Sequence, residues 1–275
     1  MMLRRRLGCQ LAIFVALFAI AKAQAPGKPS ETELAAITAR GVLLAEYDSA
    51  AWQATDAVQA AHPVEGRGVS RYIAQTTDAG WVVDFGRLNQ AQDKFLVVYE
   101  AVQVSAKFEV KSFDPPIEDK GWNLAAAKGI ETVMRDFGAT TRPYNVAVLP
   151  EGHHHSMYVY LYPAQVKAGV YPLGADVRYR VTLDGMKIIE KRQMHKSIIE
   201  SIPTRSDITV KVGYHSHVLS EIPEDTDVLL VLTRQPRLPE IVVAGPYMFT
   251  IDVNGQIKME DRPNPKNRSR SGRPQ

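Results

Sequence analysis

Cysteine is almost absent from this sequence, since Cys9 is the only one among 275 residues. It lies inside "MMLRRRLGCQLAIFVALFAIAKAQA", which has the features of a signal peptide. Cleavage would leave a mature chain without thiols, which excludes disulfides, thiolate metal ligands and a cysteine nucleophile. Any metal site must then use His, Asp and Glu side chains. An exported chain of this length without disulfides also predicts a core large enough to hold the fold unaided.

A long hydrophobic run is also missing. The apolar segment 11–21 is shorter than the roughly 20 residues that a membrane-spanning helix needs. It follows a basic start and ends in small residues, so we predict cleavage after Ala23 or Ala25. Cys9 precedes the apolar segment instead of following it, which argues against a lipoprotein. We expect an exported protein, periplasmic or secreted, with no transmembrane anchor after cleavage.

Positive charge is scarce in the body of the chain, although the formal net charge is +3. Residues 26–260 carry 24 basic and 29 acidic groups, a net charge of −5. This balance gives no support for a nucleic-acid partner. The segment 261–275 is basic and has no large apolar residue, so we predict a disordered, solvated tail.

The familiar catalytic motifs are absent as well. The sequence has no glycine-rich phosphate loop, no G-x-S-x-G and no H-E-x-x-H, and no internal repeat of clear period. Nothing therefore indicates a nucleotide-binding protein, an α/β-hydrolase or a zincin-type helix.

The elements that are present predict an α+β fold with two layers, a helix on a mostly antiparallel sheet, arranged in two such blocks. In the first block, 26–113, an S-x-x-E capping box at Ser30 opens a helix that ends before His62-Pro63. Gly41 in that helix marks a break or a close-packing point. Strands are expected at 70–77, 80–88, 94–104 and 107–113.

The second block, 122–260, follows a predicted linker at 114–121 that contains two prolines and several charges. It opens with an amphipathic helix that Gly138 stops, and strands follow. Asp184-Gly185 and Asn254-Gly255 are hairpin signals. The run "EDTDVLLVLTRQP" fits either a buried strand or a short helix.

Two histidine-containing stretches are interpreted as ordinary surface. His153–His155 are consecutive, and adjacent side chains on a strand point to opposite faces, so we predict a polar loop. The stretch "EKRQMHKSIIE" holds Glu190, His195 and Glu200 and has the mixed charge of a solvated strand face.

The stretch "GYHSHVLSEIPEDTD" is different. His215 and His217 are two residues apart, so both imidazoles project to one side of an extended chain. A turn at Pro223 would let Asp227 add a carboxylate oxygen. Three such ligands and a water would make an open zinc site, the catalytic kind. The alternative is a strand that ends in a polar loop.

This stretch resembles the metal-binding signature of the JAMM (MPN/JAB-type) metalloprotease domain, H-[ST]-H followed by P-S-x-x-D. Here "HSH" matches fully and "PEDTD" keeps the proline and the aspartate. The resemblance covers roughly 196–258 and implies His215, His217 and Asp227 as zinc ligands. It also implies a glutamate as general base, for which Glu190 and Glu200 are the candidates.

The match departs from the family at Glu224, which replaces the serine, and the loop before Pro223 is one residue shorter. Two functions remain open. One is a zinc-dependent hydrolase of peptide or isopeptide bonds. The other is a non-catalytic envelope protein that binds a protein or a cell-envelope component, for which the alternating Tyr158, Tyr160 and Tyr162 offer a binding face.

Overall fold

The computed structural model describes residues 28–61, 68–152, 155–201 and 209–261. The predicted signal peptide and nearly all of the predicted tail lie outside these residues, and Asp261 ends the last strand. The described residues form helices and mostly antiparallel strands, and the strands make several sheets, which confirms the α+β class. No helix in the described ranges combines the length and the apolar character that a membrane span requires.

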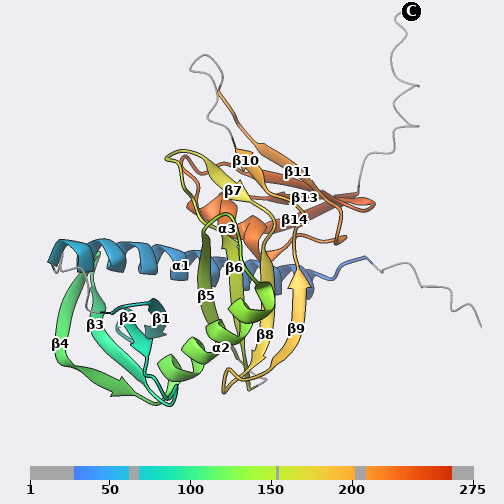
Figure 1. The fold of residues 1–275 in the computed structure, drawn as a ribbon. Coiled ribbons are helices and arrows are strands. Elements are labelled where there is room, and N and C mark those ends of the chain that lie inside the picture. Colours follow the sequence, from blue (N-terminus) through green and yellow to red (C-terminus); the bar gives the residue numbers. More distant parts are fainter. Residues whose placement is uncertain (1–27, 62–67, 153–154, 202–208, 262–275) are drawn as a thin grey trace, which may run out of the picture.

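Helix α1 (Glu31–Ala61) runs along the whole molecule (Figure 1). The Ser30 hydroxyl accepts the backbone N–H of Glu33, as half of the expected capping box. Gly41 is a close-packing point, because a Cβ there would lie 2.5 Å from Cβ of Val228 on helix α3 (Asp225–Thr233). The first turns of α1 thus pack on the C-terminal part of the chain and the later turns on the sheets.

The first sheet is an antiparallel meander of β1 (Arg71–Thr77), β2 (Gly80–Leu88), β3 (Phe95–Val104) and β4 (Lys107–Asp119). Strand β4 continues through most of the segment that we expected to be a linker. Its two prolines are tolerated because β4 is the edge strand of the sheet and because they fall where a bulge interrupts its pairing with β3, so no ladder hydrogen bond is lost.

Helix α2 (Trp122–Phe137) follows and ends before Gly138, as predicted. The central sheet has the order β5 (Tyr144–Glu151), β6 (Ser156–Pro163), β8 (Val177–Thr182) and β9 (Ile188–Gln193). Asp184-Gly185 forms the turn between β8 and β9. Short strands β7 (Tyr171–Leu173) and β10 (Ile199–Ser201) pair with each other.

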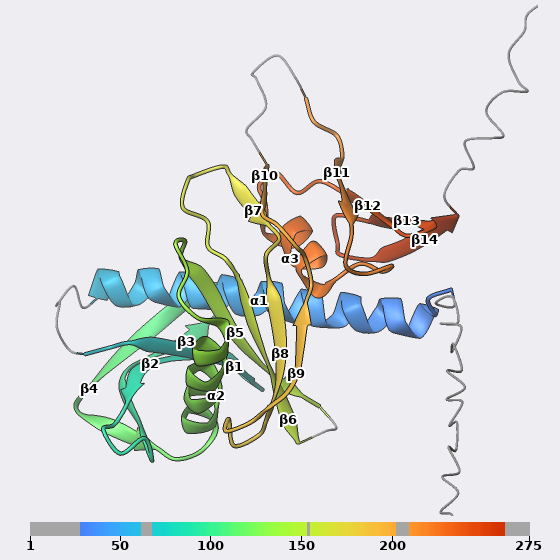
Figure 2. The ribbon, with the colours of Figure 1, turned by 45° about the vertical axis from the view of Figure 1, so that its right-hand side comes forward.

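The C-terminal unit contains β11 (Gly213–His217), α3 (Asp225–Thr233), β12 (Glu240–Ala244), β13 (Tyr247–Ile251) and β14 (Ile257–Asp261). Strands β11 and β12 are parallel and α3 connects them, so the ambiguous apolar run is a helix. In both ribbon views this unit lies on one side of α1 and the two larger sheets lie on the other (Figures 1 and 2).

The two predicted blocks do not have separate cores. One buried cluster combines Tyr47 of α1, Val83 of β2, Tyr160 of β6 and Leu229 of α3. The boundary that the structure does support lies between the central sheet and the C-terminal unit, whose own core contains Val228, Val242 and Phe249. The candidate site lies across this boundary.

Candidate metal centre

Strand β11 places His215 and His217 as the sequence predicts. Their side chains are buried, whereas those of Tyr214 and Ser216 point to solvent. This alternation follows from the two-residue period of a strand. Both imidazoles therefore face the first turn of α3.

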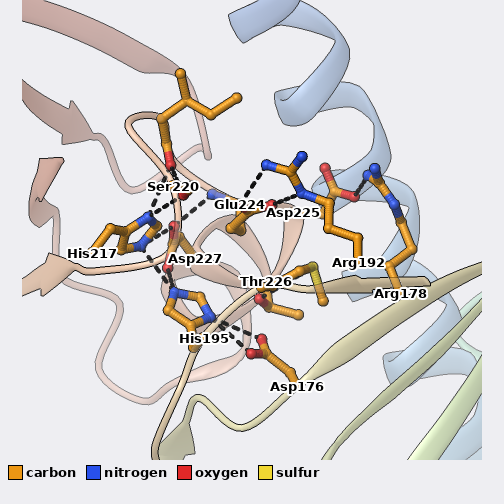
Figure 3. Close-up of polar contacts among 12 residues, drawn as sticks. Asp176, Arg178, Arg192, His195, His217, Ser220, Glu224, Asp225, Thr226 and Asp227 are labelled. Atoms are coloured by element: carbon orange, nitrogen blue, oxygen red, sulfur yellow. Dashed lines mark hydrogen bonds and ion pairs between the residues drawn. The ribbon is translucent and has the colours of Figure 1, made fainter. Parts of the chain in front are cut away.

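The first turn of α3 supplies a carboxylate. Asp227 has no exposed surface, and its Oδ2 accepts the backbone N–H of Glu224 at 2.7 Å. This capping bond satisfies one free N–H at the helix start and fixes the direction of the side chain. Asp227 therefore both caps the helix and faces the histidines (Figure 3).

A fourth side chain, His195, joins these three, and the sequence interpretation missed it. We expected a solvated strand face, but His195 lies in the segment after β9 and is only 8% exposed. Its Nε2 lies 2.9 Å from Nε2 of His217. The only sequence signal was the apolar Met194 beside it, which is also fully buried.

The donor atoms of the four side chains converge. Nε2 of His215 lies 3.2 Å from Nε2 of His217, and Oδ1 of Asp227 lies 3.0–3.1 Å from Nε2 of His215 and of His195. A tetrahedral ion with bonds of 2.0–2.1 Å would separate its ligands by about 3.3 Å. The cluster therefore has nearly the size of a tetrahedral coordination shell, and these four residues could hold a metal ion.

The outer nitrogens of the imidazoles indicate what the inner ones can do. Nδ1 of His195 contacts Asp176 at 2.8 Å, Nδ1 of His215 contacts Glu240 at 2.9 Å, and Nδ1 of His217 contacts the carbonyl of Ile222 at 2.8 Å. Carboxylates and carbonyls only accept, so each Nδ1 carries the proton. In the neutral ring, each Nε2 then points a lone pair at the centre, as metal-ligating histidines do.

With neutral imidazoles, the centre thus collects acceptors without a donor. Oδ1 of Asp227 is buried, and its neighbours are Nε2 of His215 at 3.0 Å and Nε2 of His195 at 3.1 Å, which donate to it only when protonated. Around the three imidazoles stand the carboxylates of Asp176, Asp227 and Glu240, and the guanidinium of Arg234 pairs with Glu240 at 2.8 Å. Three negative charges and one positive charge give the site a net charge of −2, which a divalent cation would balance.

Without an ion, protons would supply part of this charge. Burial by itself lowers the pKa of His195, but the charges of Asp227 and Asp176 outweigh it and raise this pKa to about 11. The pKa of His215 likewise rises to about 9 against its burial, because of Asp227 and Glu240. Burial favours the neutral form of Asp227, yet the facing histidines hold its pKa well below the usual value. A metal ion would displace these protons.

The candidate bases, Glu190 and Glu200, lie elsewhere. Both carboxylates are exposed, and they pair with Arg180 at 3.5 Å and Arg142 at 2.7 Å. Among the described residues, the acids in contact with the imidazoles are Asp176, Asp227 and Glu240. Asp176 stands just before β8, and Glu240 begins β12.

Of the predicted histidine loop only His155 is described, and it is exposed with a positive φ of 46°.

The other side of the α3 start is also charged, but it is internally neutralised. Asp225 accepts Nε of Arg40 at 3.1 Å, a guanidinium N–H of Arg178 at 2.6 Å and the hydroxyl of Tyr160 at 2.9 Å. Glu224 pairs with Arg192 of β9 at 2.7 Å. Figure 3 shows Asp225 directed toward Arg178 and Asp227 toward His195 and His217. These pairs position the helix that carries Asp227.

Searches of protein-family models, curated proteins and solved structures found no match for this chain. The resemblance of the stretch from His215 to Asp227 to the JAMM signature therefore stays a prediction. What the structure establishes is a buried group of three histidines and one aspartate that could hold a metal ion.

Proposed function

We propose that this protein is an exported metal-binding protein that holds one zinc ion through His195, His215, His217 and Asp227. The ion serves a structural purpose in a non-catalytic binding module. The observation that supports this proposal most strongly is the convergence of three Nε2 atoms on the buried carboxylate of Asp227, those of His195 and His215 on Oδ1 and that of His217 on Oδ2, at 3.0–3.1 Å.

Zinc is the ion that suits these donors best. Imidazole and carboxylate ligands without thiolates fit zinc as well as other first-row metals, and near-tetrahedral spacing favours zinc among them. Hard ions such as calcium and magnesium prefer oxygen ligands, and three of the four donors are nitrogens. The carboxylates at His195 and His215 are the usual orienting partners of zinc-bound histidines.

The structural purpose follows from the number and origin of the ligands. Four protein donors fill a tetrahedral shell, whereas catalytic zinc keeps one position for water or substrate. His195 extends from the central sheet, and the other three ligands belong to β11 and α3 of the C-terminal unit. A bound ion would therefore tie the two units together. The site predicted from the sequence, with three ligands and an open position, lacked His195.

Metal analysis of the purified protein tests this proposal. We expect one equivalent of zinc per chain, and its loss in His217→Ala and Asp227→Asn. His155→Ala is the matched control, because it removes an exposed histidine outside the cluster. His195→Ala should weaken zinc binding by at least tenfold. Full zinc content in Asp227→Asn, or no metal in the wild-type protein under non-chelating purification, would overturn the proposal.

A hydrolase of the JAMM type is the second candidate, and one observation favours it. A cavity of about 660 Å³ borders His217, with Glu224, Arg192 and Tyr247 also in its lining, so a substrate could approach the cluster from this side. Zinc in such an enzyme would polarise the scissile carbonyl and activate water. The required open position would have to come from displacement of His195. Zinc-dependent cleavage of peptide substrates by the wild-type protein would favour this candidate.

A further inference from the structure

A second cavity, of about 630 Å³, lies away from the cluster of ligand atoms. It is bounded by α1, α3 and the segment that joins β6 to β7. Its volume falls within the range of small-molecule sites, which is roughly 300–1,000 Å³. Apolar walls come from Ala45, Leu173 and Leu229, and polar and charged side chains make up about as much of the lining.

One of these polar groups is a carboxylate without a cation. Asp48 of α1 lines the cavity, and its Oδ1 accepts the hydroxyl of Tyr162 at 2.6 Å and the side-chain amide of Asn145 at 3.4 Å. Both donors are neutral, and among the described residues no Lys, Arg or His pairs with Asp48. Burial raises the pKa of Asp48, and the Tyr162 hydrogen bond offsets this in part. A cationic ligand would supply the charge that the chain does not.

The second feature is an aromatic side chain at the mouth of the cavity. Trp52 follows Asp48 by one helical turn, lines the same cavity, and is 68% exposed. Residues four apart lie on one face of a helix, so the indole and the carboxylate flank a common space. An exposed tryptophan leaves a large apolar ring in contact with water, whereas the same indole face attracts a desolvated cation.

The charge of the lining selects the sign of the ligand. Glu46, Asp48 and Asp176 line the cavity, and Arg237 is its one basic residue among the described part of the chain. Asp176 is occupied by His195, which leaves the half-buried Asp48 carboxylate as the acidic group open to a ligand.

We propose that this cavity binds an organic cation, an amine or guanidinium on an apolar body, with Asp48 as its counter-ion and Trp52 stacked on it. None of the four proposed metal ligands lines this cavity, although Asp176, which contacts His195, does. Such recognition needs the negative charge of Asp48 and the face of Trp52, whereas the apolar walls hold the body of the ligand.

Calorimetric titration with two probes of the same shape tests the proposal. Benzylamine carries a positive charge at neutral pH, and benzyl alcohol does not. We expect the wild-type protein, at about 150 mM salt, to bind benzylamine at least tenfold more tightly than benzyl alcohol. Asp48→Asn should remove this preference. Asp56→Asn, which changes an exposed carboxylate of the same helix outside the cavity, should keep it.

Thermal melting separates a binding effect from misfolding. Asp48→Asn should be about as stable as the wild type, since the amide removes a half-buried charge that has no cation beside it. Trp52→Ala alters an exposed residue and should fold normally, yet weaken benzylamine binding about tenfold or more. Equal affinity for the two probes in the wild type, or an undiminished preference in folded Asp48→Asn, would overturn the proposal.

Discussion

Asp225 and Asp227 stand two residues apart at the start of α3, and neither has any exposed surface. The chain treats them differently. Asp225 is surrounded by donors, two of them the guanidinium groups of Arg40 and Arg178. Asp227 has one backbone donor on Oδ2 and faces three imidazole nitrogens with its carboxylate.

The contrast separates two ways of burying a charge. A carboxylate that the protein itself neutralises brings its own cations, and its contacts are complete within the chain. A carboxylate kept for a metal is surrounded by further acceptors, which is costly unless an ion arrives. Both aspartates are fully buried in the same helix turn, so depth of burial cannot explain the difference between them. The groups around each carboxylate explain it.

The largest expected effect is the loss of stability on removal of the ion. An ion that binds only the folded state, at a free concentration about 1,000 times its Kd, stabilises by about 4 kcal/mol. Chelation should therefore lower the free energy of unfolding by roughly that amount, as urea titrations with and without chelator would measure. In Asp227→Asn the chelator should change nothing. Identical unfolding curves of the wild type in the two buffers would contradict this comparison.

The next effect concerns the other aspartate. Asp225→Asn keeps the shape but leaves the charges of Arg40 and Arg178 without their anion, and their side chains are only 27% and 12% exposed. Removing one partner of a buried pair costs about 3–5 kcal/mol, and the partial exposure of Arg40 argues for about 3 kcal/mol. Urea unfolding measures this loss.

The metal content of that variant sharpens the contrast. If Asp225 is only an internal ion pair, the folded Asp225→Asn protein should keep one equivalent of zinc. Loss of zinc together with the loss of stability would mean that the two aspartates form one unit.

Sequence reasoning found the ligands that lie within one short segment. His215, His217 and Asp227 span 13 residues, and strand alternation with a turn at Pro223 brings them together by local geometry. His195, Asp176 and Glu240 reach the same place only through the packing of the central sheet against the C-terminal unit. Apart from the apolar Met194 beside His195, little in their local sequence distinguishes them from surface residues, so pattern alone could not assign them.

The fold divides in the same way. Local signals predicted the helix from Glu31, the helix before Gly138 and the hairpin turns at Asp184 and Asn254. Strand β4 runs through most of the segment 114–121, where we expected a linker, because two prolines break a central strand but not an edge strand. Which sheet an element joins is a long-range property that residue patterns do not encode.

A third buried carboxylate tests what happens when neither a cation nor a metal is near. Asp84 of β2 is 5% exposed, and its partner is the neutral amide of Asn123 at 2.7 Å. Burial raises the pKa of Asp84 to about 6. Since the folded pKa exceeds the unfolded value, its contribution to stability is full below about pH 4 and is lost as the pH rises through 6.

Asp84→Asn should therefore match the wild type below about pH 4 and exceed its stability by about 3 kcal/mol at pH 7.5. Urea titrations of both proteins at several pH values measure the difference, in which the titration of the metal cluster cancels. A difference that does not change with pH would show that Asp84 keeps its charge at no cost.

The smallest effects are expected at Glu190 and Glu200, the two candidates for a general base. Their side chains are 46% and 45% exposed, and each pairs with an arginine at the surface. Solvent-exposed pairs contribute little, so Glu190→Gln and Glu200→Gln should each change stability by less than about 0.5 kcal/mol. Zinc content should not change, because neither carboxylate belongs to the cluster. Metal analysis and urea unfolding check both statements. If either variant lost a zinc-dependent peptidase activity while keeping its zinc, the result would favour the catalytic interpretation over the structural one. A general base is needed for turnover but not for binding the ion.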